Sequence, residues 1–236
     1  MSKTIAIMQP YFFPYIGYWQ LMGVVDQFVV YDNIQYTKKG WINRNRYLRN
    51  GKAETFSLPL KKDSGSLDVK DRYLSDAFDQ EANKLLRQIE GAYKKAPNFQ
   101  EGIVLFEKCL RYEDKNLFNF IYHAIIQIQE CLGIKTEIIV SSTIDCDHSL
   151  QAEQRVKAIC HALGADKYIN PIGGLELYSK ENFQADGIRL LFHRAKPLEY
   201  KQYVEAFEPW LSILDVIMFN SRQDISSLMI GNYELV

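Results

Sequence analysis

The sequence lacks the features that mark secreted, membrane-spanning and strongly charged proteins. Its first residues show no charged start, long apolar stretch and small-residue cleavage site, so no signal peptide is expected. The most apolar early region, residues 5–31, is interrupted by polar residues and prolines and is too broken to span a bilayer. The net charge of −1 gives no whole-protein field that would favour nucleic acid or membrane binding.

Cysteine and histidine are scarce, and neither is arranged as a metal site. None of the four cysteines forms a C-x-x-C pair, so we expect reduced thiols in a cytoplasmic protein. Cys146 and His148 share a polar loop, and we predict that both are dispensable and that no structural zinc is bound. The motifs G-x-x-x-x-G-K-[ST], G-x-G-x-x-G, H-E-x-x-H and G-x-S-x-G are absent, so no cofactor is assigned.

The hydrophobic pattern predicts a single α/β domain over residues 1–236. Apolar runs at Ile5–Met8 and Phe28–Tyr31, joined by a helix over 16–25, form a βαβ unit whose strands should be parallel neighbours. Later alternation predicts a mainly parallel, Rossmann-like sheet with helices on both faces. The other elements expected are strands at 137–140, 167–169 and 188–192, helices at 151–163, 209–219 and 225–230, a hairpin of 41–47 with 55–60 turning at Asn50-Gly51, and a helical insert or lid over 78–132 with helices at 78–94, 103–110 and 117–132.

Positive charge is concentrated in residues 33–62. This window carries eight basic side chains and one acidic one, Glu54, within a chain whose net charge is −1. Because Arg and Lys recognise phosphate oxygens through charge-assisted hydrogen bonds, the window predicts a phosphate-bearing ligand. A solvated basic surface is the alternative interpretation.

Ligands of open parallel sheets bind beyond the carboxyl ends of the strands, so we expect the site where three loops converge. These are Gln9–Tyr15, Asp32–Asn45 and Asn170–Gly174. Binding roles are assigned as follows: Lys39 and Arg44 to phosphate, Trp41 to stacking, Asn43 and Asn45 to polar readout, Gly173 and Gly174 to backbone contact with an anion, and Gln9, Tyr11, Tyr15 and Asn170 to further polar contacts. Asp32 is the first candidate for general base and His193 the second.

The segment Pro14–Tyr18 is similar to the H-x-G-H signature of nucleotidylyltransferases and class I tRNA synthetases. It follows the first expected strand and opens a helix, but both histidine positions are tyrosines, Tyr15 and Tyr18. The similarity favours a related fold more than a related activity.

Four longer segments resemble the WbqC-like family, and together they cover nearly the whole chain. They are residues 9–18 (QPYFFPYIGY), 31–45 (YDNIQYTKKGWINRN), 163–170 (LGADKYIN) and 211–215 (LSILD). The resemblance implies a cytoplasmic role with nucleotide-linked amino sugars in the biosynthesis of O-antigen, the polysaccharide of lipopolysaccharide, or of a related surface polysaccharide. It also implies an acyl or aminoacyl donor, free or borne on a carrier protein, for transfer to the sugar amine.

Three functions follow from these observations. The first is a transferase that acts on a nucleotide-linked amino sugar. The second is a nucleotidylyltransferase-like enzyme that uses a nucleoside triphosphate with Mg²⁺. The third is a non-catalytic nucleotide- or RNA-binding protein, which the net charge disfavours.

Overall fold

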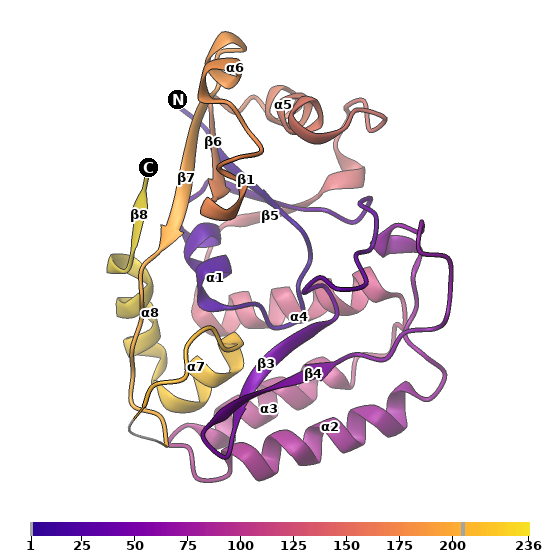
Figure 1. Ribbon diagram of the computed structural model, residues 1–236, viewed down its shortest axis with the longest axis vertical. Coiled ribbons are helices and arrows are strands. Elements are labelled where there is room, and N and C mark those ends of the chain that lie inside the picture. The colour runs from indigo at the N-terminus through magenta and orange to yellow at the C-terminus, as the bar shows by residue number, and fades with distance from the viewer. Residues whose placement is uncertain (1, 204–205) are drawn as a thin grey trace.

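A six-stranded, mainly parallel sheet forms the upper part of the molecule (Figure 1). The computed structural model describes residues 2–203 and 206–236. The strands are β1 (Thr4–Met8), β2 (Gln27–Val30), β5 (Glu137–Val140), β6 (Lys167–Pro171), β7 (Arg189–Ala195) and β8 (Tyr233–Leu235), in the order β5-β2-β1-β6-β7-β8. The predicted parallel pairing of the first two strands is confirmed, with Ile5 opposite Gln27 and Met8 opposite Val30. Within the described part of this six-stranded sheet, only β8 runs antiparallel to its neighbour.

Both faces of this sheet are buried, as the continuous apolar runs of its strands predict. Ala6, Phe28 and Val30 belong to the larger apolar cluster, whereas Ile5 and Val29 belong to the smaller one. Helices α1 (Ile16–Gly23), α4 (Leu117–Leu132) and α8 (Arg222–Gly231) pack on the first face, and α5 (Ala152–Ala162) and α6 (Lys180–Ala185) on the second. The fold is therefore the predicted Rossmann-like α/β class.

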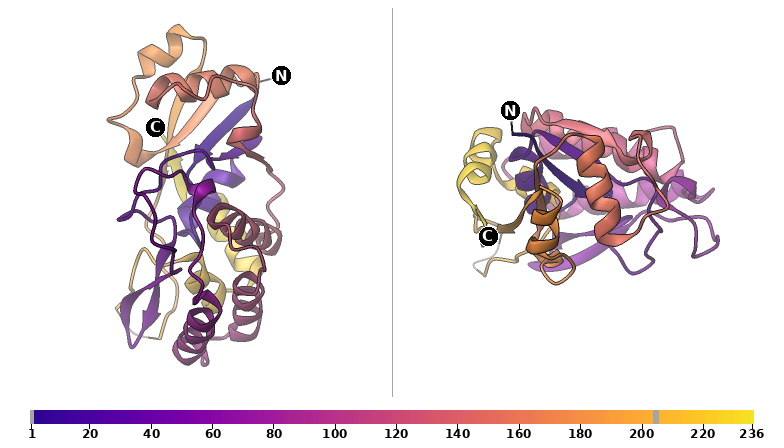
Figure 2. Two further views of the ribbon diagram at one scale, coloured as in Figure 1. Left: turned by 90° about the vertical axis from the view of Figure 1, so that its right-hand side faces the viewer. Right: turned by 90° about the horizontal axis from the view of Figure 1, so that it is seen from above.

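A hairpin and three further helices lie at the end of the molecule away from α5 and α6 (Figure 2). The hairpin strands are β3 (Arg44–Arg49) and β4 (Lys52–Ser57), and the helices are α2 (Phe78–Tyr93), α3 (Phe99–Leu110) and α7 (Ile213–Phe219). The turn is at Asn50-Gly51 as predicted, and both residues have positive φ, as a two-residue hairpin turn requires. Three helices occupy residues 78–132, where the helical block was expected.

The chain departs from the predicted elements at its C-terminal side. The expected helix at 209–219 begins only at Ile213, because Trp210 has φ of 60° and the Ser212 side chain caps the helix by accepting from Leu214 N–H. Helix α6 and strand β8 were not expected from the sequence. Three short 3₁₀ helices complete the described elements: η1 (Val69–Asp71), η2 (Ser141–Thr143) and η3 (Ile172–Gly174). In the described part of the chain no helix has the length and apolarity needed to cross a membrane.

Candidate functional site

Two of the three loops expected at the site are joined directly. The Phe12 backbone N–H donates to the Ile42 carbonyl at 2.9 Å, and the Asn45 side chain donates to the Phe13 carbonyl at 2.8 Å. The N-terminus of α7 joins them, because Ile213 N–H donates to the Pro14 carbonyl. Three segments that resemble one family, 9–18, 31–45 and 211–215, therefore meet at the base of the β3–β4 hairpin.

The basic window lines a pocket of about 630 Å³ between the loop that follows β2 and the segment that follows β4. Among the described residues that line it, five are cationic and one, Asp63, is acidic. The cations are Lys38, Arg44, Lys61, Lys62 and Arg72. A pocket of this size and sign suits a ligand that carries phosphate groups.

Arg72 also lines this pocket, although it lies outside the basic window and its sequence context gives no signal for it. It is only 7% exposed, and its guanidinium lies over the Tyr36 ring at 4.4 Å and donates to the Ser64 carbonyl at 2.9 Å. Its Nε is buried and has no hydrogen-bond partner among the described residues. The guanidinium is therefore held in place and contributes fixed positive charge to the wall of the pocket, which favours an anionic ligand.

Arg44 lines the pocket, but Lys39 does not belong to the described lining. The Arg44 guanidinium donates to the carbonyls of Lys39 and Gly40, which holds the loop around it. Trp41 is 44% exposed and has Arg44 and Arg46 over its ring at 5.3 and 5.8 Å. Its accessible surface fits the predicted stacking role, which stays a prediction.

The amides of Asn43 and Asn45 are already engaged by the protein. Asn43 accepts from the Tyr36 hydroxyl at 2.9 Å and donates to the Leu58 carbonyl at 2.8 Å. Asn45 is buried and bonds to the backbone of the 9–15 loop through its amide N–H. Both side chains thus position the loops, and their predicted contact with a ligand would have to use the remaining hydrogen-bonding capacity.

Asp32 has one carboxylate oxygen held and one free. Its Oδ1 accepts from the Ser141 hydroxyl and from the Ser142 backbone N–H, both at 2.9 Å. Within the described part of the chain, Oδ2 accepts no hydrogen bond. It is also absent from the fully buried polar atoms that lack a partner, so it keeps some accessible surface. The carboxylate is therefore fixed in orientation at the carboxyl end of β2 with one oxygen available as a base.

His193 lies far from Asp32 in the sheet. It is on β7, and three strand spacings of roughly 4.8 Å separate β7 from β2, so the two side chains are on the order of 14 Å apart. His193 is 4% exposed and stacks against Tyr233 at 5.1 Å. Burial lowers its pKa to about 4, so it is a neutral imidazole of low basicity at pH 7.

Asn170 and Gly174 form a tight turn after β6. Asn170 accepts from the Tyr168 hydroxyl at 2.7 Å and donates to the Pro171 carbonyl at 3.0 Å. A Cβ on Gly174 would lie 1.9 Å from the Asn170 amide nitrogen, whereas one on Gly173 would meet nothing within 4 Å. Gly173 thus presents open backbone, but no hydrogen bond among the described residues joins this turn to residues 33–45.

Gln9, Tyr11 and Tyr18 form a small polar group at the end of β1. The Tyr11 hydroxyl donates to Gln9 Oε1, and the Tyr18 hydroxyl donates to the Gln9 carbonyl, both at 3.3 Å. Burial raises the pKa of Tyr11 and of Tyr18, so both are neutral donors. Tyr15 precedes α1 and lies 5.1 Å from the Trp210 ring. The order of strand, loop and helix found around an H-x-G-H segment is therefore present. The tyrosines at the two histidine positions contact the protein itself, Tyr18 through the Gln9 carbonyl and Tyr15 through the Trp210 ring.

Cys146 and His148 lie beside the same edge of the sheet. The Cys146 thiol is 3.9 Å from His148 Nδ1, which also contacts the Asn33 amide at 3.2 Å. Burial raises the pKa of Cys146, which disfavours the thiolate. No three His, Cys, Asp or Glu side chains in the described ranges are grouped to hold a metal ion. The dispensability of Cys146 and His148 stays a prediction.

Comparison with known proteins finds one family and one relative. A model of the WbqC-like protein family matches residues 9–227, a span that contains every candidate site residue. An uncharacterized protein of Mycobacterium tuberculosis is 30% identical over 221 residues, which cover 92% of this chain and 94% of the relative. No solved structure matches the chain significantly.

Proposed function

The chain belongs to the WbqC-like protein family, and we propose that it is a transferase that acylates or aminoacylates the amine of a nucleotide-linked sugar. The pocket lined by Lys38, Arg44, Lys61, Lys62 and Arg72 carries this proposal. It is the place where the basic window meets the buried, fixed guanidinium of Arg72. The expected setting is the cytoplasmic assembly of O-antigen or a related surface polysaccharide.

The diphosphate of the nucleotide sugar is assigned to the cations of this pocket. Arg72 is held by Tyr36 and Ser64, so its positive charge faces the ligand without a further loss of side-chain freedom on binding. Lys38 and Lys62 make no hydrogen bond or ion pair with described residues, so their ammonium groups are available to phosphate oxygens. The exposed Trp41 ring is assigned to the nucleobase or sugar.

Asp32 is the group we assign to the amine. It is three positions before Gln35, which lines the pocket, so the two backbones are at most about 11 Å apart. The Asp32 carbonyl also accepts from the Lys70 N–H at 3.0 Å, two positions before Arg72, which lines the pocket. His193, buried about 14 Å across the sheet, is less suited to this role.

The transfer step requires one base and one leaving group. The sugar nitrogen attacks the acyl carbonyl carbon of the donor, a C–N bond forms, and the bond from that carbon to the donor's sulfur or oxygen breaks. Asp32 Oδ2 accepts the proton that the nitrogen loses and returns it to the leaving thiolate or alkoxide. Ser141 and Ser142 hold Oδ1, which keeps Oδ2 in a fixed direction during both transfers.

Calorimetric titration with a panel of nucleotide sugars tests this proposal. We expect nucleotide-linked amino sugars to bind, and Arg44→Ala to weaken binding by about 1.5–3 kcal/mol, the worth of a hydrogen bond to a charged group. Lys62→Ala should weaken binding without disturbing the loop, because Lys62 makes no described contact that holds it. Mass spectrometry of the amino sugar after incubation with acyl and aminoacyl thioesters then tests the transfer.

Arg189→Ala is the matched control, because Arg189 is an exposed arginine at the opposite, amino-terminal end of a sheet strand. Its binding constants should equal those of the wild type. The proposal is wrong if the wild type binds no nucleotide sugar, or if Arg44→Ala and Lys62→Ala both bind as tightly as Arg189→Ala.

A further inference from the structure

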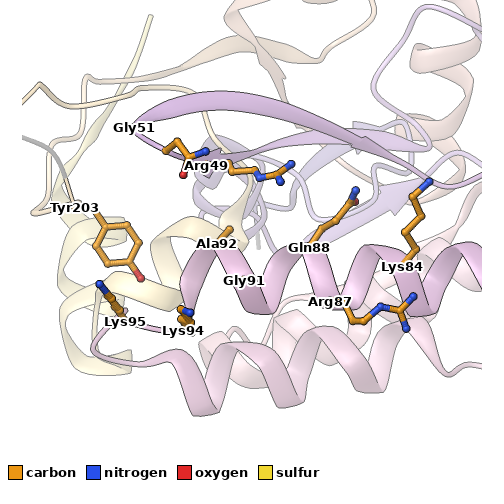
Figure 3. A pocket seen from close by; sticks show the side chains of 11 residues that line it. Arg49, Gly51, Lys84, Arg87, Gln88, Gly91, Ala92, Lys94, Lys95 and Tyr203 are labelled. Carbon is orange, nitrogen blue, oxygen red and sulfur yellow. The ribbon is translucent and has the colours of Figure 1, made fainter.

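A second basic groove lies between the tip of the β3–β4 hairpin and helix α2 (Figure 3). Its volume is about 860 Å³, larger than that of the pocket described above. Lys84 and Gln88 point from α2 toward the hairpin, and the Arg49 side chain lies on the hairpin side (Figure 3). Nothing in the proposed reaction uses this groove.

The charged residues that line the groove, among those described, are all positive. Five cations line it, Arg49, Lys84, Arg87, Lys94 and Lys95, and no acidic side chain among the described residues does. Arg49 pairs with Glu54 and Lys84 with Glu81, but the other three cations form no ion pair within the described chain. The three cations without an ion pair leave net positive charge in the groove, which attracts a multiply charged anion.

The helix dipole explains only part of this cluster. Lys94 and Lys95 follow the last turn of α2, where cations are favourable near the helix C-terminus. Lys84 and Arg87 lie in the middle of the helix, beyond the reach of that effect. The cations extend from Lys84 to Lys95, about 16 Å at 1.5 Å per residue, which is longer than a single phosphate needs.

Gly91 leaves the helix α2 side of the groove without a side chain at its position. Glycine within a helix costs about 1 kcal/mol relative to alanine. A Cβ at Gly91 would meet no atom within 4 Å, so close packing does not demand glycine there. The missing side chain instead widens the groove between Gln88 and Lys95, on the face that these residues share.

One end of the groove carries an aromatic ring and the middle carries amides. Tyr203 is 42% exposed, lies beside Lys95 in Figure 3, and is held edge-on by Phe219 at 4.8 Å. Asn50 and Gln88 line the same space. A fixed ring, two amides and a row of cations match the base, the sugar or base edge, and the phosphates of a nucleotide.

We propose that this groove is a second anion site, which binds a nucleoside polyphosphate. One described aromatic side chain against five cations favours a small phosphate-rich ligand over single-stranded RNA, whose binding depends on several stacking platforms. The site is separate from the substrate pocket. Arg44 and Arg49 are five residues apart on β3, about 17 Å, so a ligand in one site does not fill the other.

Titration of the full-length protein with ATP, GTP and inorganic pyrophosphate tests the site. We expect Lys84→Gln/Lys95→Gln to raise the Kd of the nucleoside triphosphates at least tenfold. The matched control, Lys108→Gln/Lys196→Gln, removes two exposed lysines outside the groove and should leave the Kd unchanged. Arg44→Ala, in the substrate pocket, should also leave it unchanged.

Four results would overturn the proposal. They are no binding of any nucleoside triphosphate by the wild type, equal weakening by the control pair, loss of binding in Arg44→Ala, and tighter binding of a short RNA that Lys84→Gln/Lys95→Gln abolishes. The pocket lined by Arg44 is tested separately, by titrating Arg44→Ala and Arg189→Ala with nucleotide sugars. A failure of that pocket can therefore be distinguished from a failure of the groove beside α2.

Discussion

At the scale of single residues, the same side-chain chemistry serves different ends according to burial. Asn43 and Asn45 have the amides expected of a ligand-reading pair, yet the protein uses these amides to join β3 to the 9–15 loop and to Leu58. Arg72, which lies outside the basic window of the sequence, contributes a buried and fixed positive charge to the pocket. Residue type and spacing predict the available chemistry, but the hydrogen-bond partners that consume it come from segments distant in sequence.

His193 provides a test of burial by pH. Its pKa is lowered to about 4, below the unfolded value of about 6.5, so the unfolded chain binds more protons between these pH values. Its contribution to stability is therefore complete above pH 6.5 and is lost as the pH falls toward 4. Urea unfolding should show that His193→Phe, which keeps a ring against Tyr233, loses about 2 kcal/mol less than the wild type between pH 7 and pH 5.

The control for this comparison is His161→Phe, at an exposed position near the end of α5. It should lose as much stability as the wild type over the same pH interval. Identical pH dependence in His193→Phe and the wild type would contradict the inferred burial of a neutral imidazole.

At the scale of elements, the strands, helices and turns whose signal lies in neighbouring residues could be predicted from the sequence. The apolar runs of β1 and β2, the helical spacing in α2 and the Asn50-Gly51 turn each act over a few neighbouring residues. Strand β8 has three residues and pairs with β7 through tertiary contact, so its own sequence carries too little pattern. The late start of α7 likewise depends on Trp210 and Ser212, whose conformations α7's apolar run does not specify.

The turn formed by η3 gives a prediction for an element held by one glycine. Gly174→Ala should lower the free energy of unfolding by about 1–3 kcal/mol, because its Cβ would overlap the Asn170 amide. Gly173→Ala, one residue away with open space around it, should cost much less. In an Asn170→Ala background the cost of Gly174→Ala should shrink, and additive costs in denaturant unfolding would refute this contact.

At the scale of the whole molecule, charge is local rather than global. Although the net charge is only −1, the chain has two basic cavities. One is the pocket that Arg44 lines, beside the carboxyl edge of the sheet, and the other is the groove between the hairpin tip and α2. The first could be predicted from the sequence because its cations are mostly contiguous in residues 33–62. The second combines Arg49 with cations spaced along α2, so only the packing of the hairpin on that helix reveals it.

The most direct test of the central claim is a crystal structure of the protein soaked with a nucleotide-linked amino sugar. We expect the diphosphate within hydrogen-bond distance of Arg44 and Lys62 and beside the Arg72 guanidinium, with the sugar amine directed toward Asp32 Oδ2. A diphosphate bound only in the groove beside α2, or a substrate pocket that stays empty at saturating ligand, would contradict it.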